Sequence, residues 1–393
     1  MRERRFVSCA LSGQRISVQS ERGIAMFFES FLLNLAVLAA LIVALIFDYV
    51  TKFFSYWYVR HVPYKTPVPF FGSDYHRVLL LRSTSEEVKI LYSRYPDSFV
   101  GTIKSRIPDL LVKQPDAIKK ILSTDFANFH SRGLALDKSK DVCLRNNPFY
   151  AEGEKWTLLR EALDLILNGA VSEINVSLHE HLTGTNGVVN AQQLLTEILD
   201  AVFKNCLFAG NEDGSLLSEL RKSLQRRTYI EKFKSYLKEL FPSVFVSLGL
   251  VTAPEALRLY PPYSVINRKC VKAYNMSDSG MALDKKVTVT VPVDAIHKDP
   301  VHYRNPYTFD PDRFLERENN AMHAFTYLPF GAGPRKCNGE QLALKIIRTV
   351  TEAVIKEYKI EVTDETPTEL KLADHDFKRT IISNVWLKFT RSE

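Results

Sequence analysis

The residues best suited to chemistry surround one cysteine in a stiff loop. The stretch Pro329–Gly339, PFGAGPRKCNG, gathers three glycines, two prolines, two basic residues and Cys337. Glycine lets the backbone approach a flat ligand closely. A helix that begins near Asn338 would add a positive dipole and lower the pKa of the thiol. The loop therefore predicts a metal-bound thiolate; the alternative is a turn around a buried cysteine.

The spacing within this loop is specific. Its fixed residues follow F-x-x-G-x-R-x-C-x-G and are Phe330, Gly333, Arg335, Cys337 and Gly339. Five fixed residues in ten arise by chance in roughly one chain in 10,000. Arg335 places a permanent cation near the cysteine, suited to a carboxylate on the ligand's rim. An axial thiolate on haem iron supplies electron density that favours cleavage of an O–O bond.

The elements that must position this loop are mainly helical. Helical spacing is predicted for residues 85–96, 115–126, most of 153–240 and 340–358. Strands are predicted as a hairpin-like pair within 99–114, at 287–293, and as a pair near 360–363 and 381–389. The fold class expected is mostly α with a small β portion.

An apolar segment near the N-terminus predicts a membrane anchor. Residues 31–47 are apolar except for Asn34, and at 1.5 Å per residue they nearly span a hydrocarbon core. Aromatic residues follow within 49–58, as at membrane interfaces. A buried core helix or a cleaved signal peptide is the alternative. Three prolines in residues 61–73 predict a stiff, extended connector.

Composition narrows the function classes. The 393 residues carry a net charge of +7, but the basic residues are spread along the chain, which argues against nucleic-acid binding. The five cysteines are far apart and form no CxxC pair, so a disulfide framework is excluded and a reducing compartment is expected. Residues 1–25 are polar and without pattern, and we hypothesise that translation begins at Met26.

Together these motifs resemble the cytochrome P450 monooxygenases. Glu255 and Arg258 match E-x-x-R, whose side chains can pair on a helix. FDPDRF at 309–314 resembles the element whose arginine, here Arg313, joins that pair and locks the cysteine loop. Trp156 and Arg160 match W-x-x-x-R. The stretches 128–133, NFHSRG, and 266–274, INRKCVKAY, resemble the insect detoxifying branch.

The resemblance implies a haem-thiolate monooxygenase of the EC 1.14 class. Cys337 would bind the haem iron, and the propionates would be seated by Trp156, Arg160, Arg268 and Arg335. The substrate would be lipophilic, and electrons would come from NADPH through cytochrome P450 reductase, with cytochrome b5 as a further partner. The resemblance also implies the endoplasmic reticulum membrane, with the haem domain on the cytosolic side. The expected organisation is an extension (1–25), an anchor (27–50), a connector (51–73) and a haem domain (74–393).

One part of the family pattern is missing. The family's central helix carries an acid-threonine pair and should lie between Arg160 and Glu255, but the chain is far too short there. FAGNEDGS at 208–215 is the nearest match, with Asp213 where threonine belongs. We expect a loop there and a deletion near 250–254. The alternative function is therefore an impaired or inactive haem-binding paralogue or splice form.

Overall fold

The computed structural model describes two compact units, Met1–Val59 and Arg60–Glu393. The described residues are 31–48, 55–68, 72–73, 75–79, 81–104, 107–133, 147–172, 174, 176, 178, 182, 187–208, 253–276, 280–314, 324–368, 370, 372–375, 378–381 and 383–392. Three predicted features fall outside these residues: the extension 1–25, the segment 209–215 expected as a loop, and residues 250–252 at the expected deletion.

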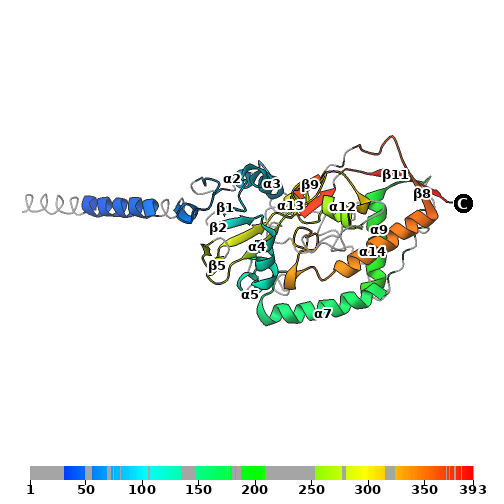
Figure 1. Cartoon of the computed structure of the whole chain (residues 1–393), viewed down its shortest axis with the longest axis horizontal. Coiled ribbons are helices and arrows are strands. Elements are labelled where there is room, and N and C mark those ends of the chain that lie inside the picture. Colours follow the sequence, from blue (N-terminus) through cyan, green and yellow to red (C-terminus); the bar gives the residue numbers. More distant parts are fainter. Residues whose placement is uncertain are drawn as a thin grey trace, which may run out of the picture. The chain divides into compact units, whose positions relative to one another are not determined.

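The first unit contains an exposed apolar helix, Phe31–Asp48 (Figure 1). It has 18 residues and is the one helix in the described part of the chain that is long and apolar enough to cross a membrane. Its large side chains are exposed along its whole length, Phe47 by 72%. A buried core helix, one of the two alternatives to an anchor, is therefore wrong; a signal sequence would pass the same test of length and composition.

The second unit contains a four-stranded sheet in the order β1-β2-β7-β4. The predicted hairpin is confirmed: β1 (Phe99–Lys104) pairs antiparallel with β2 (Ile107–Val112). The predicted strand at 287–293 is β7 (Thr288–Val291), which runs parallel to β2 and antiparallel to β4 (Ile266–Lys269). Helix α3 (Thr84–Arg94) covers the sheet, because its Val88 and Leu91 share an apolar cluster with Val100 and Leu111.

Local sequence signals and backbone pairing fix the start of α3 and the path of the connector. The N-cap of α3 is Ser83, whose hydroxyl accepts from the Glu86 N–H. The sequence pattern favoured a Ser cap at Ser85, which instead is buried in the first turn. The proline-rich connector pairs with β1, since the Lys65 N–H donates to the Gly101 carbonyl at 3.0 Å.

Three long helices of the unit pack with a second sheet, and two antiparallel pairs, β5 (Tyr274–Met276) with β6 (Met281–Leu283) and β9 (Leu372–His375) with β10 (Lys378–Ile381), complete the described sheets. Helix α14 (Glu340–Glu357), predicted from its apolar spacing, contacts α7 (Gly153–Ser172), and α7 contacts α9 (Ala191–Phe208) (Figure 1). The sheet has the order β3-β11-β8. Its strands are β3 (Val188–Asn190), β8 (Tyr358–Val362) and β11 (Trp386–Arg391). One apolar cluster joins these helices and strands, so the mostly helical fold class is confirmed.

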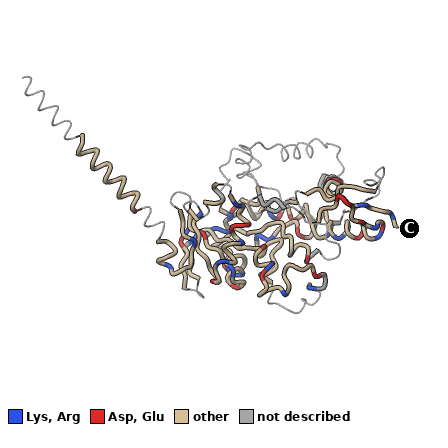
Figure 2. Tube along the Cα trace, turned by 90° about the horizontal axis from the view of Figure 1, so that it is seen from above, with Lys and Arg blue, Asp and Glu red and all other residues tan. Residues whose placement is uncertain are grey.

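Charge is distributed evenly over the described part of this unit. Lys and Arg alternate with Asp and Glu along the trace in Figure 2. This agrees with the expectation from sequence that the basic excess is spread along the chain.

Candidate functional site

The cysteine loop is shaped by a glycine that no other residue could replace without movement. Gly333 has φ +70°, and a Cβ there would lie 1.8 Å from the Leu122 carbonyl oxygen. Leu122 belongs to a π-helical turn, Lys120–Thr124, that continues α4 (Pro115–Lys119). The predicted helix 115–126 therefore forms, but its second half is wider than α-helical. This close backbone approach fixes the loop against the turn.

Cys337 lies partly buried where the loop meets α14. Its N–H donates to the Phe330 carbonyl at 2.9 Å, which closes the loop. Gly339 is the N-cap of α14, and a Cβ there would lie 3.9 Å from the cysteine sulfur, an ordinary contact.

The thiol itself is not acidic. Burial raises the pKa of Cys337, although a hydrogen bond from the Gly339 backbone and the charges of Arg132 and Arg160 oppose the rise. The sequence-based expectation of a lowered pKa is therefore wrong for the protein alone. A metal that binds this sulfur must displace its proton.

Arg335 is buried beside the cysteine. Its guanidinium donates to the carbonyls of Phe149 (3.2 Å) and Ala151 (2.6 Å) and lies 4.7 Å from the centre of the Trp156 ring. Its Nε is buried and has no partner among the described residues. Burial lowers its pKa to about 10.

Arg268 lies on strand β4 and is only 2% exposed, so the alternative of an exposed strand arginine is wrong. It donates to the Asn267 carbonyl at 2.9 Å, and its buried Nε has no partner among the described residues. Burial, and then the charge of Arg335, lower its pKa to about 9.

A third arginine, Arg132, was not singled out from the sequence, although NFHSRG was. The Ser131 carbonyl accepts from the Lys269 N–H at 2.8 Å, so this segment extends the edge of β4. Arg132 donates to the carbonyls of Phe149 (3.3 Å) and Arg335 (3.1 Å). Burial, with the charges of Arg268 and Arg335, holds its pKa well below the ordinary value.

Two buried guanidinium groups, of Arg268 and Arg335, and the half-buried one of Arg132 thus gather beside Cys337. Arg132, Arg268 and Arg335 form no ion pair with a carboxylate in the described part of the chain, and only exposed Glu152 offsets the charge of Arg335. Buried like charges are costly unless an opposite charge joins them. This cluster therefore fits an anionic ligand, as the propionates of a haem would be.

The W-x-x-x-R residues lie on α7, at the other side of the loop. Trp156 packs against Phe126 at 5.7 Å between ring centres. Arg160 donates to the Lys336 carbonyl at 2.9 Å, next to Cys337. The Asn338 amide donates to Asp164 at 2.6 Å and so ties the loop to α7.

The predicted E-R-R group is assembled, with Glu255 and Arg258 fully buried and Arg313 partly exposed. Helix α12 (Ala253–Leu259) carries Glu255 and Arg258, joined by two bonds of 2.8 and 2.7 Å. Arg313, on the 3-10 turn Pro311–Phe314, donates to Glu255 at 3.1 Å. Arg258 also donates to the His297 and Pro306 carbonyls, each at 2.7 Å. The group therefore pins several loops of the unit to α12.

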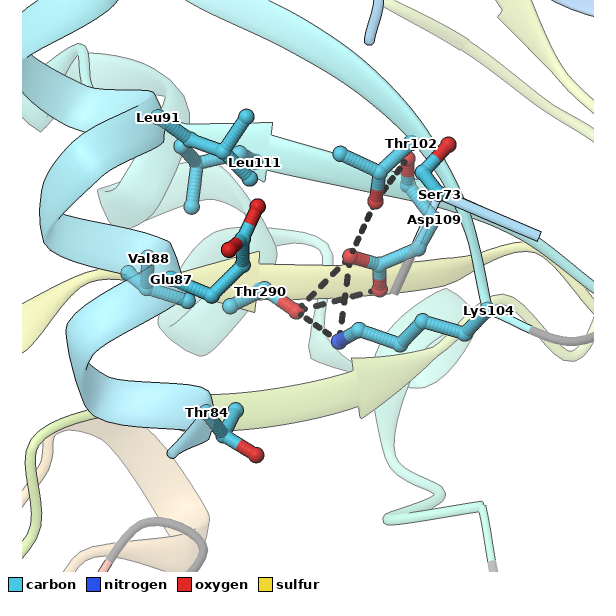
Figure 3. A pocket seen from close by; sticks show the side chains of 10 residues that line it. All are labelled: Ser73, Thr84, Glu87, Val88, Leu91, Thr102, Lys104, Asp109, Leu111 and Thr290. Atoms are coloured by element: carbon cyan, nitrogen blue, oxygen red, sulfur yellow. Dashed lines mark hydrogen bonds and ion pairs between the residues drawn. The ribbon is translucent and has the colours of Figure 1, made fainter. Parts of the chain in front are cut away.

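A cavity of about 30 Å³ lies elsewhere, between α3 and the four-stranded sheet (Figure 3). Asp109 accepts from Thr102, Thr290 and Lys104 at its edge. None of the residues predicted for the haem site lines this cavity. It has room for one or two water molecules and not for a substrate.

Comparison with known proteins agrees with these motifs. The cytochrome P450 family model matches residues 252–384. Cytochrome P450 9e2 of Blattella germanica is 38% identical over 188 residues, which are 47% of this chain and 34% of that protein. Cytochrome P450 6k1 of the same species is 30% identical over 138 residues, 35% of this chain and 26% of that protein. These alignments span only a quarter to a third of the relatives they match.

A longer but weaker alignment spans nearly a whole relative. Probable cytochrome P450 28d2 of Drosophila melanogaster is 22% identical over 473 positions, covering 86% of this chain and 94% of that protein. A chain of 393 residues cannot fill 473 positions, so this alignment skips many positions of the relative. With the cysteine motif and the assembled E-R-R group, these matches show that residues 252–384 are a segment of the cytochrome P450 family.

Proposed function

We propose that this chain is a membrane-anchored haem-thiolate monooxygenase that inserts one oxygen atom of O₂ into a lipophilic small molecule. Its electrons would come from NADPH through cytochrome P450 reductase, with cytochrome b5 as a second donor. The cluster of Arg132, Arg268 and Arg335 beside Cys337 carries the proposal, because it forms no ion pair with a carboxylate among the described residues and its charge requires an anion. The match to the cytochrome P450 family, whose members are generally monooxygenases of the EC 1.14 class, supports it.

The chain's own residues have distinct roles in this proposal. Cys337 would ligate the iron, and Phe330, Gly333 and Gly339 shape its loop. The propionates would be held by Trp156, Arg160, Arg268 and Arg335, to which we add Arg132. When bound, haem with an axial thiolate supplies the chemistry that cleaves the O–O bond of O₂.

The proposal also covers the membrane in which the chain resides and its division into an anchor and a haem domain. The helix Phe31–Asp48 would anchor the chain in the endoplasmic reticulum membrane, with residues 74–393 as a haem domain on the cytosolic side. The exposure of every large apolar side chain of that helix supports an anchor.

A second candidate is a haem-binding form without monooxygenase activity. Two observations favour it: the acid-threonine sequence is absent between Arg160 and Glu255, and the alignment with the Drosophila relative skips many positions. Without a helix over the distal side, water would reach the site and protons would arrive unguided.

Spectroscopy and turnover separate the two candidates. The full chain, purified with haem, should give a red-shifted ferrous–CO Soret band, and Cys337→Ala should lose that band. With reductase and NADPH, a monooxygenase forms hydroxylated product from a lipophilic probe. A haem-binding form without monooxygenase activity would consume NADPH and release reduced oxygen without forming hydroxylated product. A wild-type chain that never gives a thiolate-type spectrum would refute both.

A further inference from the structure

His297 joins the E-R-R group to the chain that enters the cysteine loop. It lies on the short helix α13 (Val293–His297) and is fully buried. Its Nδ1 lies 3.1 Å from the Arg258 carbonyl oxygen, and its Nε2 accepts from the Leu328 N–H at 2.8 Å. Leu328 stands immediately before the loop Pro329–Gly339.

These two partners determine the protonation of the ring. The Leu328 N–H can only donate, so Nε2 must carry a lone pair. The Arg258 carbonyl can only accept, so the proton must lie on Nδ1. A doubly protonated ring would set one N–H against another. His297 is therefore neutral, in the Nδ1–H tautomer.

The contact with Arg258 runs in both directions. The Arg258 guanidinium donates to the His297 carbonyl at 2.7 Å, while the His297 ring donates to the Arg258 carbonyl. The same guanidinium is held by Glu255. The position of the imidazole is thus set by the E-R-R group.

Aromatic packing holds the other side of the ring. Tyr327 stacks on His297 with 5.6 Å between ring centres and 18° between planes, and its hydroxyl donates to the Pro254 carbonyl on α12. The Tyr303 hydroxyl donates to the Thr326 carbonyl at 2.9 Å. The chain from Thr326 to Leu328 is therefore fastened at three successive residues.

Two backbone hydrogen bonds lead from Leu328 to Cys337. The Leu328 carbonyl accepts from the Gly331 N–H at 3.1 Å, and the intervening Phe330 carbonyl accepts from the Cys337 N–H at 2.9 Å. Each link is a backbone bond, so a shift at Leu328 displaces the carbonyl that orients Cys337.

We propose that His297 is a positioning residue for the thiolate site. Its neutral imidazole relays the position of Arg258 to the Leu328 backbone and so fixes the loop that presents Cys337. The role in iron ligation rests on the proposed function; the relay between α12 and the loop does not.

Two substitutions of His297 separate the relay from packing. In the full chain, His297→Phe keeps the ring but leaves the Leu328 N–H and the Arg258 carbonyl without partners. His297→Gln restores an acceptor for Leu328 and a donor for Arg258. His302→Gln, five residues away, is the matched control, since no side-chain bond is found for His302 among the described residues. Circular dichroism checks that each variant is folded.

The first measurement is hydrogen–deuterium exchange of the peptide 326–339 in the full chain without haem. His297→Phe should speed its exchange by roughly tenfold or more, because a buried donor is left unpaired. His297→Gln and His302→Gln should stay close to wild type. Exchange in His297→Phe equal to wild type would overturn the relay, whatever the haem result.

The second measurement is the ferrous–CO spectrum of the same variants with haem. His297→Phe should lose most of the red-shifted thiolate band at equal haem content, and His297→Gln should recover most of it. If wild type shows that band and His297→Phe keeps it undiminished, the positioning role is wrong while the proposed function stands. If wild type never shows the band, the proposed function fails, and the exchange experiment alone decides the relay.

Discussion

At the scale of single residues, the site is defined by three positive charges that form no ion pair with a carboxylate in the described part of the chain. Arg132, Arg268 and Arg335 are each held by carbonyl groups, which orient a guanidinium without neutralising it. A protein selected for stability alone would replace such a cluster with apolar side chains. Its presence indicates a binding role that offsets the cost.

Arg268→Met tests this binding role, because the free energy of unfolding should rise while the affinity for haem falls. Without haem, we expect the free energy of unfolding in urea to rise by about 1 kcal/mol or more, since a buried like charge is removed. Haem affinity, measured by titration, should fall roughly tenfold, since a charge-assisted contact is lost. Lys269→Met, on the same strand, is the control. A loss of both stability and affinity would indicate a structural role instead.

His297 should give a pH-dependent stability. Burial lowers its pKa to about 3, against the opposing effect of its bond to Arg258; Asp294 raises the pKa, whereas the charges of Arg258 and Lys298 lower it. Below about pH 6.5 the unfolded chain binds a proton that the folded protein refuses until about pH 3. Stability should therefore fall as the pH drops through this window.

The measurement compares wild type with His297→Phe from pH 7 to pH 4. The difference between their free energies of unfolding should shrink by up to about 1.4 kcal/mol per pH unit below pH 6.5. A difference that is constant with pH would mean that the imidazole takes up its proton in the folded protein over the same pH range as in the unfolded chain.

At the scale of elements, the loop is positioned by close backbone approaches as well as by side chains. Gly333 against the π-helical turn at Leu122 is the tightest of them. The turn widens the helix that began at Pro115, and its Leu122 carbonyl oxygen lies where a side chain at position 333 would have stood.

Gly333→Ala should therefore be much worse than another alanine at positive φ. Gly280 has φ +63° and nothing within 4 Å of an added Cβ, so Gly280→Ala should cost about 1–2 kcal/mol from backbone strain alone. Gly333→Ala adds a clash with a carbonyl oxygen and should cost at least about 3 kcal/mol. Urea unfolding of both variants checks this. Equal costs would show that the loop and turn separate freely.

The buried E-R-R group makes a similar prediction for the loops around α12. Glu255→Gln leaves buried Arg258 without its counter-charge and Arg313 with only Asp310, 3.9 Å away, and should cost about 3–5 kcal/mol. Glu352→Gln is the control, because Glu352 pairs with Arg348 at the surface of α14, where solvent screens the pair and the change should have little effect. A change at Glu255 as small as that at Glu352 would contradict the role given to this group.

At the scale of the whole molecule, the apolar helix Phe31–Asp48 is the proposed membrane anchor. We expect the full chain, expressed in insect cells, to stay with the membrane pellet after extraction with alkaline carbonate. Replacing Leu38 and Leu41 by Lys should release much of it, because a cation at the centre of a span costs about 3 kcal/mol each. Quantitative blotting of pellet and supernatant measures this. Release of the unaltered chain by carbonate would contradict an anchor.

The sequence by itself determined what local spacing can encode. The E-x-x-R pair, α3, α14 and the hairpin of β1 and β2 are set by residues within a few positions of each other, and each forms as predicted. The cysteine motif is also local, and its role as a thiolate site stays a prediction. The fold class and family followed from the order of these motifs.

Only the tertiary structure decided which distant residues meet. Arg132 and Arg335 are 203 positions apart, and His297 and Leu328 are 31 apart, so no local pattern pairs them. The burial of Arg268 and the raised pKa of Cys337 depend on which neighbours exclude water, and that too is set by packing. Spacing specifies which chemical groups are present, whereas their charge, desolvation and partners depend on contacts that exist only once the chain has folded.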